Sequence, residues 1–354
     1  MDFYTNSVVQ KDLDFISRAN LNFEKFRDST VLITGINGML ATNLAYTFLF
    51  LNKKFQLNIK IVGLGRNELE FKSRFSDNLN NLTFVKQDVN KKLTIKLPID
   101  YIFHAATNAS PENMVENPVS IALVNTIGTA NVAEFALQKG ATVHFLSTRE
   151  VYGESYKDSI SEEDNSVLNA LDIRNVYPIS KMSAEAMLLA YQHEYDLNVS
   201  ISRIAHAYGP GMKLQNDGRV MADFLGRVTR NENIVLKSDG SAERSFLYVR
   251  DAILGILTIV LKSTKKNCVF NVSNEKEPIT VKNLALLVKE FGHKFNVGIQ
   301  VKLPLDKKNN VGYSNVKRTP LNTNKVEKLG WKPSVNLKTG IFNTLQVHSK
   351  GGDY

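Results

Sequence analysis

The chain has only one cysteine, Cys268, among its 354 residues. A single thiol can form neither an internal disulfide nor a cysteine-based zinc site, so we expect no disulfide framework and no metal centre. The cysteine content fits a reducing compartment, and we expect a cytoplasmic protein. Residues 1–6 also lack the basic patch and the apolar core of a signal peptide.

Long apolar runs are absent as well. The longest stretches, such as Met39–Leu51, are too short to span a bilayer, and this one contains Asn43. We therefore expect no membrane association. With 43% hydrophobic and 22% charged residues, the composition is that of an ordinary soluble globular protein. The length suffices for two domains, or for one large α/β unit with an appended lobe.

Acidic residues are outnumbered by basic ones, which gives a formal net charge of +9. Such a charge fits either a nucleic-acid-binding surface or a soluble enzyme with an anionic substrate. The lysines are dispersed along the chain, and no basic run is interleaved with aromatic residues. This pattern favours the enzyme, and we expect no nucleic-acid partner.

Short apolar, β-branched runs alternate with helical patterns through the first part of the chain. The predicted strands are Thr30–Thr34, Ile59–Leu64, Leu82–Lys86, Asp100–His104, Thr142–Ser147 and Asn198–Ile204. The helical patterns include Asn43–Leu51, Pro118–Gln138 and Ser180–Tyr195. Continuous apolar strands are typical of a parallel sheet that is covered on both faces. The alternation predicts an α/β fold of the Rossmann type, with a doubly wound parallel sheet.

The first predicted strand runs into a glycine turn, Gly35–Ala41, and then into a helical pattern. Strand, glycine turn and helix are the context of a dinucleotide-binding loop, in which the helix start presents free N–H groups to phosphate. The spacing is G-x-x-G-x-x-A rather than G-x-G-x-x-G, and a glycine-containing turn of any α/β protein is the alternative. The expected cofactor contacts in this turn are Gly35, Asn37, Gly38, Met39 and Leu40.

After about residue 205 the alternation of strands and helices changes. Helices are expected at Arg219–Arg230, Val249–Leu261, Thr280–Phe291 and 322–330, with a strand at Val269–Val272. We predict an N-terminal helical extension (1–28, with a helix at Asp12–Phe26), a dinucleotide-binding domain (29–205) and a smaller C-terminal α/β substrate lobe (206–354). Some segments of this lobe are expected to return to the sheet.

Tyr177 and Lys181 are four residues apart in a helical pattern, so they share one face of the helix. A free tyrosine has a pKa of about 10, too high for a base at neutral pH. A neighbouring cation lowers that pKa, which makes the pair a plausible oxygen base for an alcohol. The alternative is a half-buried ring beside a solvated lysine.

Polar and small residues end several predicted strands at what would be the ligand-binding edge of the sheet. Thr148 follows one strand and could hydrogen-bond the oxygen that Tyr177 deprotonates. Ala105 and Ala106 follow another, where a cofactor ribose could pass closely. Asp88, with Val89, lies in reach of an adenine amine. Each also has an ordinary structural explanation, and His104 is predicted to be a hydrogen-bonded core histidine rather than a ligand.

Taken in order, these residues and several further segments resemble the extended short-chain dehydrogenase/reductase family, in its branch of nucleotide-sugar epimerases, dehydratases and decarboxylases. The resemblance covers about residues 29–345. It is carried by Thr34–Ala41, Asp88-Val89, His104–Ala106, Asn125–Thr129, Ser147–Gly153, Tyr177–Lys181, Tyr208–Gly211, Asp217–Val220, Asp239–Ser241, Arg244–Asp251 and Leu329–Pro333. A particular likeness to UDP-glucuronate decarboxylases lies in Ala109–Pro111, Asp217–Val220 and Arg244–Asp251.

The resemblance implies a role for each matching residue. Tyr177 would take the proton of a sugar 4-hydroxyl, Lys181 would hold the nicotinamide ribose, and Thr148 would orient the 4-oxygen. Glu150 would assist chemistry at C5 or at a carboxyl group. Asn125 is implied at the cofactor. On the substrate side Arg244 would bind the diphosphate, with further contacts from Ser110, Arg149, His206, Arg219 and Val220. A 4-ketone would then permit epimerisation, loss of water or loss of a carboxylate.

Three positions depart from the patterns of this family. Arg149 stands where the dehydratases carry an aspartate acid and the decarboxylases a serine. Because arginine cannot act as an acid at neutral pH, standard 4,6-dehydration is disfavoured, and Arg149 either points away or binds an anionic group of the sugar. His206 replaces a substrate-contacting asparagine, and Gly211 replaces an arginine of the decarboxylases.

The cofactor is expected to be NAD or NADP. The second predicted strand ends without the acidic residue that binds the ribose 2′-hydroxyl of NAD, and Arg66 could face a 2′-phosphate. This arrangement slightly favours NADP, whereas the alternative is an arginine that faces solvent. We expect a nucleotide-diphosphate sugar as substrate and a homodimer as assembly. The alternatives are an NADPH-dependent 4-ketoreductase of a 4-keto-6-deoxy nucleotide sugar and a silent dinucleotide-binding regulator.

Overall fold

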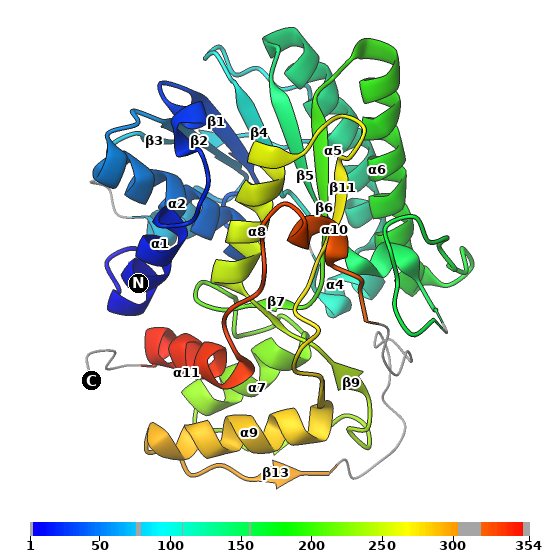
Figure 1. Cartoon of the computed structure of the whole chain (residues 1–354). Coiled ribbons are helices and arrows are strands. Elements are labelled where there is room, and N and C mark those ends of the chain that lie inside the picture. Colours follow the sequence, from blue (N-terminus) through cyan, green and yellow to red (C-terminus); the bar gives the residue numbers. More distant parts are fainter. Residues whose placement is uncertain (1–2, 76–78, 108, 156, 304–319, 350–354) are drawn as a thin grey trace.

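A seven-stranded, fully parallel sheet organises the molecule (Figure 1). The computed structural model describes residues 3–75, 79–107, 109–155, 157–303 and 320–349. The strand order is β11-β6-β5-β4-β1-β2-β3. The strands are β1 (Thr30–Thr34), β2 (Lys60–Gly65), β3 (Leu82–Lys86), β4 (Tyr101–His104), β5 (Thr142–Thr148), β6 (Val199–Ile204) and β11 (Val269–Val272). The order reverses between β1 and β4, the point at which ligands bind in open parallel sheets.

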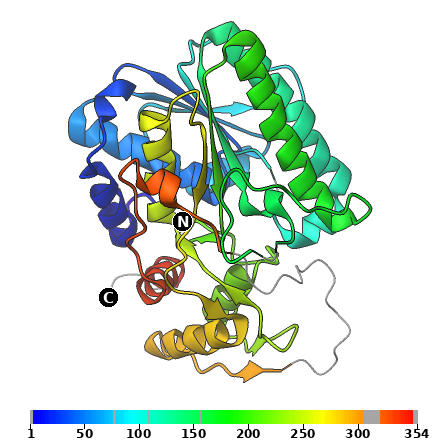
Figure 2. The same ribbon diagram turned by 45° about the vertical axis from the view of Figure 1, so that its right-hand side comes forward.

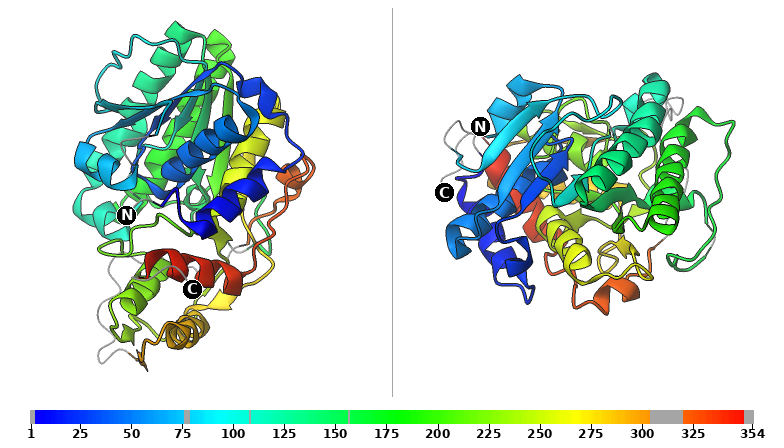
Figure 3. Two further views of the ribbon diagram at one scale, coloured as in Figure 1. Left: turned by 90° about the vertical axis from the view of Figure 1, so that its left-hand side faces the viewer. Right: turned by 90° about the horizontal axis from the view of Figure 1, so that it is seen from above.

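Helices cover both faces of this sheet, as its continuously buried strands require (Figure 3). On one face lie α1 (Ser7–Ser17), α2 (Met39–Phe55) and α8 (Val249–Lys262), which contact one another. On the other face α5 (Pro118–Lys139) and α6 (Val176–Tyr195) pack side by side (Figure 2). The predicted doubly wound Rossmann fold is therefore confirmed.

A smaller lobe lies beyond the carboxyl edge of the sheet (Figure 1). Its helices are α7 (Val220–Thr229), α9 (Val281–Lys294) and α11 (Leu337–His348). Its strands form short pairs, β8 (Ile234–Val235) with β13 (Val301–Lys302), and β9 (Glu243–Arg244) with β12 (Ile279–Thr280). β7 (Ala207–Tyr208) pairs with β10 (Leu247–Tyr248) where the lobe meets the sheet. After β10 the chain returns from the smaller lobe to the sheet as α8 and β11. Both parts of the molecule are therefore built from segments that are not contiguous in sequence.

Most predicted elements are present with ends shifted by a few residues, but two helices are not as expected. The helix predicted at Asp12–Phe26 is α1, which ends at Ser17, followed by a separate 3₁₀ turn at Phe23–Phe26. The Asn20–Asn22 segment between them has low helix propensity. The helix predicted at 322–330 is only the short α10 (Asn324–Glu327). The sequence did not predict α3 (Glu68–Arg74), α4 (Pro111–Glu116) or α11.

One helix of the described residues, α5, is long and apolar enough by length and composition to cross a membrane. Half of its most apolar stretch is buried inside the protein, where it packs against α6 and the sheet. A core helix passes the same test, so this observation is weak evidence for a membrane span.

Candidate functional site

The glycine turn after β1 forms a cradle at the point where the strand order reverses. Gly35 has φ +65°, and a Cβ there would lie 2.7 Å from the Cα of Ala106. Only glycine allows β1 and the end of β4 to approach this closely. Gly38 is the N-cap of α2 and offers no side-chain cap, so the first N–H groups of α2 are left for another acceptor. An uncapped helix start of this kind binds phosphate.

A cavity of about 470 Å³ opens at this cradle. Most of the predicted cofactor residues line this cavity. Two of the predicted substrate residues, the base Tyr177 and several residues that were not predicted as site residues line it as well. The predicted residues are Gly35, Asn37, Gly38, Met39, Leu40, Arg66, Asp88, Val89, Ala105, Ala106, Ser110, Tyr177 and Arg219. The others include Asn67, Arg74, Gln87, Thr107, Ser147 and Lys213.

Unsatisfied polar atoms in this cavity fit a dinucleotide. The side-chain oxygens of Asn37 and Thr107 are buried and have no hydrogen-bond partner among the described residues. Buried polar atoms are costly unless they are hydrogen-bonded, so these oxygens are suited to a ligand. With the uncapped start of α2, they provide the donors and acceptors that a nicotinamide dinucleotide needs.

Arg66 and Asp88 lie together at the adenosine end of the same cavity. An Arg66 nitrogen is 4.0 Å from an Asp88 oxygen, and the Arg66 side chain is 69% exposed. The loose, exposed ion pair leaves the guanidinium able to turn to a 2′-phosphate. It also leaves Asp88 able to accept from an adenine amine.

Tyr177 lies near the start of α6 and its hydroxyl is hydrogen-bonded with Thr148 at the end of β5. Burial and the Glu150 carboxylate raise the pKa of Tyr177 above its usual range, whereas Thr148, Arg174 and Arg219 lower it. Lys181, which was expected to lower the pKa of Tyr177, is not among the groups that do so. The Lys181 ammonium instead donates to the carbonyl of Leu146 at 2.8 Å.

Lys181 is nevertheless buried under the cavity, one helical turn after Tyr177. Burial lowers the pKa of the Lys181 ammonium to about 7. His104, at the end of β4, is hydrogen-bonded with the hydroxyl groups of Thr34 and Thr129. Burial lowers the pKa of the His104 imidazole to about 3. The prediction of a hydrogen-bonded core histidine at His104 is confirmed.

Cationic side chains gather on the substrate side of Tyr177. Burial and then the charges of Arg149, Arg244 and Arg219 lower the pKa of His206, so all three guanidinium groups lie within electrostatic range of this imidazole. Burial, and then the charge of Arg149, lowers the pKa of Arg244. Arg149 thus acts electrostatically on both His206 and Arg244. The ends of β5 and β6 are neighbours, and this brings Arg149 and His206 together.

The remaining predicted residues lie around this centre in different ways. Glu150 forms an ion pair of 2.8 Å with Arg174, a residue that the sequence analysis did not name. Asn125 is buried and its amide donates to Ser180 Oγ, beside Lys181. Val220 lines neither of the described cavities near the site but packs on the core at the start of α7. Ser110 is buried at the N-cap of α4.

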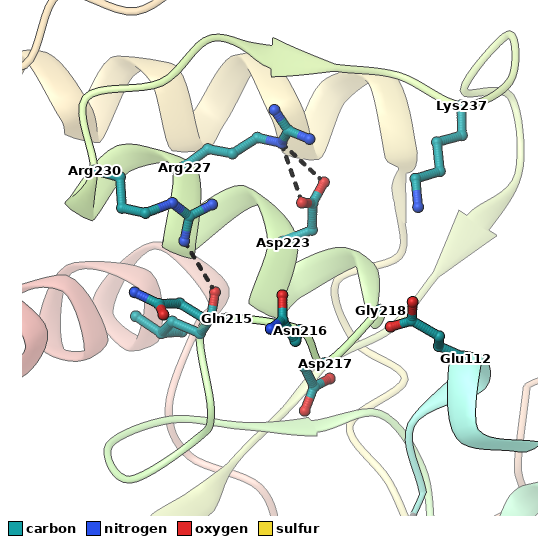
Figure 4. A pocket seen from close by; sticks show the side chains of 10 residues that line it. Glu112, Gln215, Asn216, Asp217, Gly218, Asp223, Arg227, Arg230 and Lys237 are labelled. Atoms are coloured by element: carbon teal, nitrogen blue, oxygen red, sulfur yellow. Dashed lines mark hydrogen bonds and ion pairs between the residues drawn. The ribbon is translucent and has the colours of Figure 1, made fainter. Parts of the chain in front are cut away.

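A second cavity of about 380 Å³ adjoins the first and shares Asn216 and Asp217 with it. Figure 4 shows that Asp223 and Arg227 of α7 point toward each other on one side, while Glu112 and Lys237 come from other elements. Arg227 Nε donates to both oxygens of Asp223, at 3.1 and 3.2 Å. This polar cavity extends the site into the smaller lobe.

The sequence analysis also missed Glu185 and Arg203, which form a buried polar cluster with Ser147 of the predicted Ser147–Gly153 motif. Ser147 and Arg203 both donate to the carboxylate of Glu185. A signal was present, because Glu185 follows Lys181 by four residues as Lys181 follows Tyr177. The Arg203 partner comes from β6 and could not be found by spacing.

Comparison with known proteins gives consistent results. Residues 31–273 match the model of the NAD dependent epimerase/dehydratase family. The chain is 32% identical to UDP-glucuronic acid decarboxylase 5 of Arabidopsis thaliana over 73% of this chain and 72% of that protein. A UDP-glucose 4-epimerase from Thermotoga maritima, solved with UDP-glucose, has a TM-score of 0.75 at 26% identity and covers 90% of this chain and 98% of its own. A dTDP-glucose 4,6-dehydratase from Bacillus anthracis, solved with NAD, shares the fold at a TM-score of 0.72 and 21% identity, over 91% of this chain and 97% of its own.

Proposed function

Because the chain belongs to the NAD-dependent epimerase/dehydratase family, we propose that it oxidises C4 of a nucleotide-diphosphate sugar and works through the resulting 4-keto intermediate. The observation that supports this most directly is the hydrogen bond between Tyr177 and Thr148 at the edge of the cofactor cavity. This hydrogen bond places the oxygen base, Tyr177, beside a hydroxyl group, that of Thr148, which can orient the same alcohol of the substrate. The protein is thus an enzyme rather than a silent dinucleotide-binding regulator.

In this mechanism the residues of the chain move one proton and hold the sugar. Tyr177 takes the proton of the 4-hydroxyl, and Thr148 keeps that oxygen in place. Burial raises the pKa of Tyr177, and the charges of Arg174 and Arg219 oppose this by favouring the phenolate. A bound nicotinamide dinucleotide supplies the hydride acceptor for C4. The new ketone makes the C5 proton acidic, which opens epimerisation, elimination or decarboxylation, and Glu150 is a carboxylate whose charge acts on Tyr177.

The cluster of Arg149, Arg244 and Arg219 favours an anionic substrate. Guanidinium groups bind diphosphate and carboxylate oxygens in a bidentate manner, and burial strengthens such contacts. Arg244 is suited to the diphosphate of the substrate, and the second cavity offers room for the purine or pyrimidine base of its nucleotide. Arg149 has no proton to give at neutral pH, so elimination of a C6 hydroxyl is the least supported outcome. UDP-glucuronic acid, the sugar in the relatives' names, is the first substrate to test.

The test is incubation of the purified protein with UDP-, dTDP-, GDP- and CDP-sugars and with each cofactor, followed by mass spectrometry. Loss of about 44 Da means decarboxylation, loss of about 18 Da dehydration and gain of about 2 Da reduction, whereas an unchanged mass with a changed NMR spectrum means epimerisation. Tyr177→Phe is the control, because it should abolish turnover and retain cofactor binding. Absence of turnover across the panel would contradict the proposal.

An NADPH-dependent 4-ketoreductase is the second candidate. It is favoured by one observation, the exposed Arg66 at the adenosine end of the cavity with only a loose contact to Asp88. Such an enzyme would consume NADPH with a 4-keto-6-deoxy nucleotide sugar, and the absorbance at 340 nm would fall in proportion to product, about one cofactor for each sugar. Catalytic amounts of cofactor would suffice for the first candidate.

We also propose a homodimer formed through α5 and α6. Val119, Leu123 and Ile127 of α5 are 70%, 39% and 47% exposed, and they follow one another by four residues along one helix face. An exposed apolar stripe of this kind is typical of an interface. Leu123→Glu should convert a dimer to a monomer in light scattering, whereas an unchanged mass would refute this surface.

A further inference from the structure

Glu185 continues the helical series that contains the base pair. Tyr177, Lys181 and Glu185 are spaced by four residues on α6, and their side chains are only 5%, 1% and 3% exposed. They therefore lie on one buried face of the helix. A buried carboxylate is costly unless it is paired and hydrogen-bonded, so its presence one turn below Lys181 requires an explanation.

The carboxylate of Glu185 has partners on both neighbouring strands. The Ser147 hydroxyl of β5 donates to it, and Arg203 of β6 donates from Nε at 3.1 Å to each oxygen and from Nη2 at 2.6 Å. Arg203 Nη1 continues to the hydroxyl of Tyr152 at 2.8 Å. The carboxylate is thus held in one place, near the ends of the two strands that carry the reactive centre.

Two consequences for the reactive centre follow from this position. First, burial lowers the pKa of Lys181, and the charge of Glu185 is what raises it again. Among the other described titratable groups, Tyr177 precedes Lys181 by one helical turn, and His104 of β4, which is neutral, interacts electrostatically with Lys181. The Asn125 amide of α5 donates to Ser180, the neighbour of Lys181. Secondly, Ser147 directly precedes Thr148, so its bond to Glu185 fixes the strand end that holds Thr148 against Tyr177.

We propose that Glu185 is a positioning residue of the reaction, which provides the counter-charge on the buried helix face of Lys181 and fixes the end of β5 beside Tyr177. This proposal rests on the function proposed above. Arg203 serves this role by pairing with the Glu185 carboxylate and fixing its position within the core. A purely structural ion pair between Glu185 and Arg203 would have the same distances but no influence on the titration of Lys181.

The test is the pH dependence of Glu185→Gln. Glutamine keeps the shape and can still accept from Ser147, but it removes the charge. The alkaline limb of the kcat/KM profile, where Lys181 loses its proton, should move to lower pH by about one unit. The conservative variant Glu185→Asp, which retains the charge, should keep the limb near its original pH. A loss of activity by the same factor at every pH would overturn the proposal.

Because Glu185→Gln leaves Arg203 without its counter-charge, this variant can lose stability. The double variant Glu185→Gln/Arg203→Met carries neither charge, so it should restore the melting temperature and still show the shifted limb. A double variant with the wild-type limb would refute the electrostatic role.

A measurement without sugar separates this proposal from the function on which it rests. Lys181 is expected to hold the nicotinamide ribose, so NADH and NADPH affinity, followed by fluorescence between pH 6 and 9, should weaken at lower pH in Glu185→Gln than in the wild type, by the same shift of about one unit. Cofactor binding with this shift but without turnover of any sugar would support the role of Glu185 and contradict the proposed function. Binding curves that are identical in the two proteins would remove the role of Glu185.

Discussion

Substitution of Gly35 by alanine should damage both stability and cofactor binding, for a reason that the structure allows to be separated into two parts. Gly35 has φ +65°, so an alanine there adopts a left-handed conformation that costs about 1–2 kcal/mol. In addition, its Cβ would lie 2.7 Å from Ala106 Cα and 2.9 Å from the Ala105 carbonyl oxygen. These are backbone atoms that must move, and overpacking of this kind costs about 1–3 kcal/mol.

The chain contains a matched control at Gly140, the C-cap of α5. Gly140 has φ +66°, and no atom lies within 4 Å of the position that a Cβ would take. Gly140→Ala therefore carries the backbone cost alone, about 1–2 kcal/mol, and the gain from a stiffer unfolded chain is common to both variants. The difference between Gly35→Ala and Gly140→Ala isolates the contact with the end of β4.

Urea denaturation followed by circular dichroism measures the free energy of unfolding of both variants, and fluorescence titration measures their affinity for NADH and NADPH. We expect Gly35→Ala to be less stable than Gly140→Ala by about 1–3 kcal/mol. We expect only Gly35→Ala to lose cofactor affinity, by about tenfold or more. Equal stability of the two variants, or an unchanged cofactor affinity in Gly35→Ala, would refute the reading of this turn as a cradle.

Three further predictions concern single side chains. Thr148→Val should lower kcat by about 100-fold with unchanged cofactor binding, because Tyr177 loses its hydroxyl partner, and Thr148→Ser should retain most of the activity in the same assay. Arg66→Gln should weaken NADPH binding by about tenfold relative to NADH in fluorescence titrations, whereas equal losses for both cofactors would argue against a 2′-phosphate contact. Burial raises the pKa of Asp12 to about 6 in the folded protein, although the Tyr248 hydroxyl donates a hydrogen bond to this carboxyl group. The protonated Asp12 therefore contributes to the free energy of unfolding below about pH 4, and this contribution is lost as the pH rises through 6. Asp12→Asn should remove that loss of about 3 kcal/mol between pH 4 and 7 in urea denaturation, and a wild-type pH dependence in the variant would contradict the assignment.

Local patterns predicted much of the sheet because each strand is encoded by its own residues. Thr30–Thr34 and Leu82–Lys86 have the predicted bounds, since a continuous apolar or β-branched run followed by a turn marks a buried parallel strand. The N-terminal helix was predicted too long, because Asn20 and Asn22 are weak signals of a helix end. The paired strands of the smaller lobe have 2 residues each, too few for an alternation of buried and exposed side chains to be recognised in the sequence.

The same distinction applies to the site. The glycine turn and the Tyr177–Lys181 pair are local, since a turn conformation and a helix face are properties of a few consecutive residues. The pKa of Tyr177 was misjudged because burial and the Glu150 carboxylate, which raise it, depend on the packing of segments that are distant in sequence. The spacing of residues on one helix gives no information about such neighbours.

The sequence by itself determined the class of the protein, an α/β enzyme with a dinucleotide turn and a tyrosine base on a helix. The tertiary structure decided which charges surround that base. The adjacency of β5 and β6 brings Arg149 near His206, and the packing of α6 on β6 brings Glu185 beside Arg203, although these residues are distant in the chain. The physical reason is that the hydrophobic periods encode which face of an element is buried, whereas the strength of an interaction between charges depends on their separation and burial in the folded molecule.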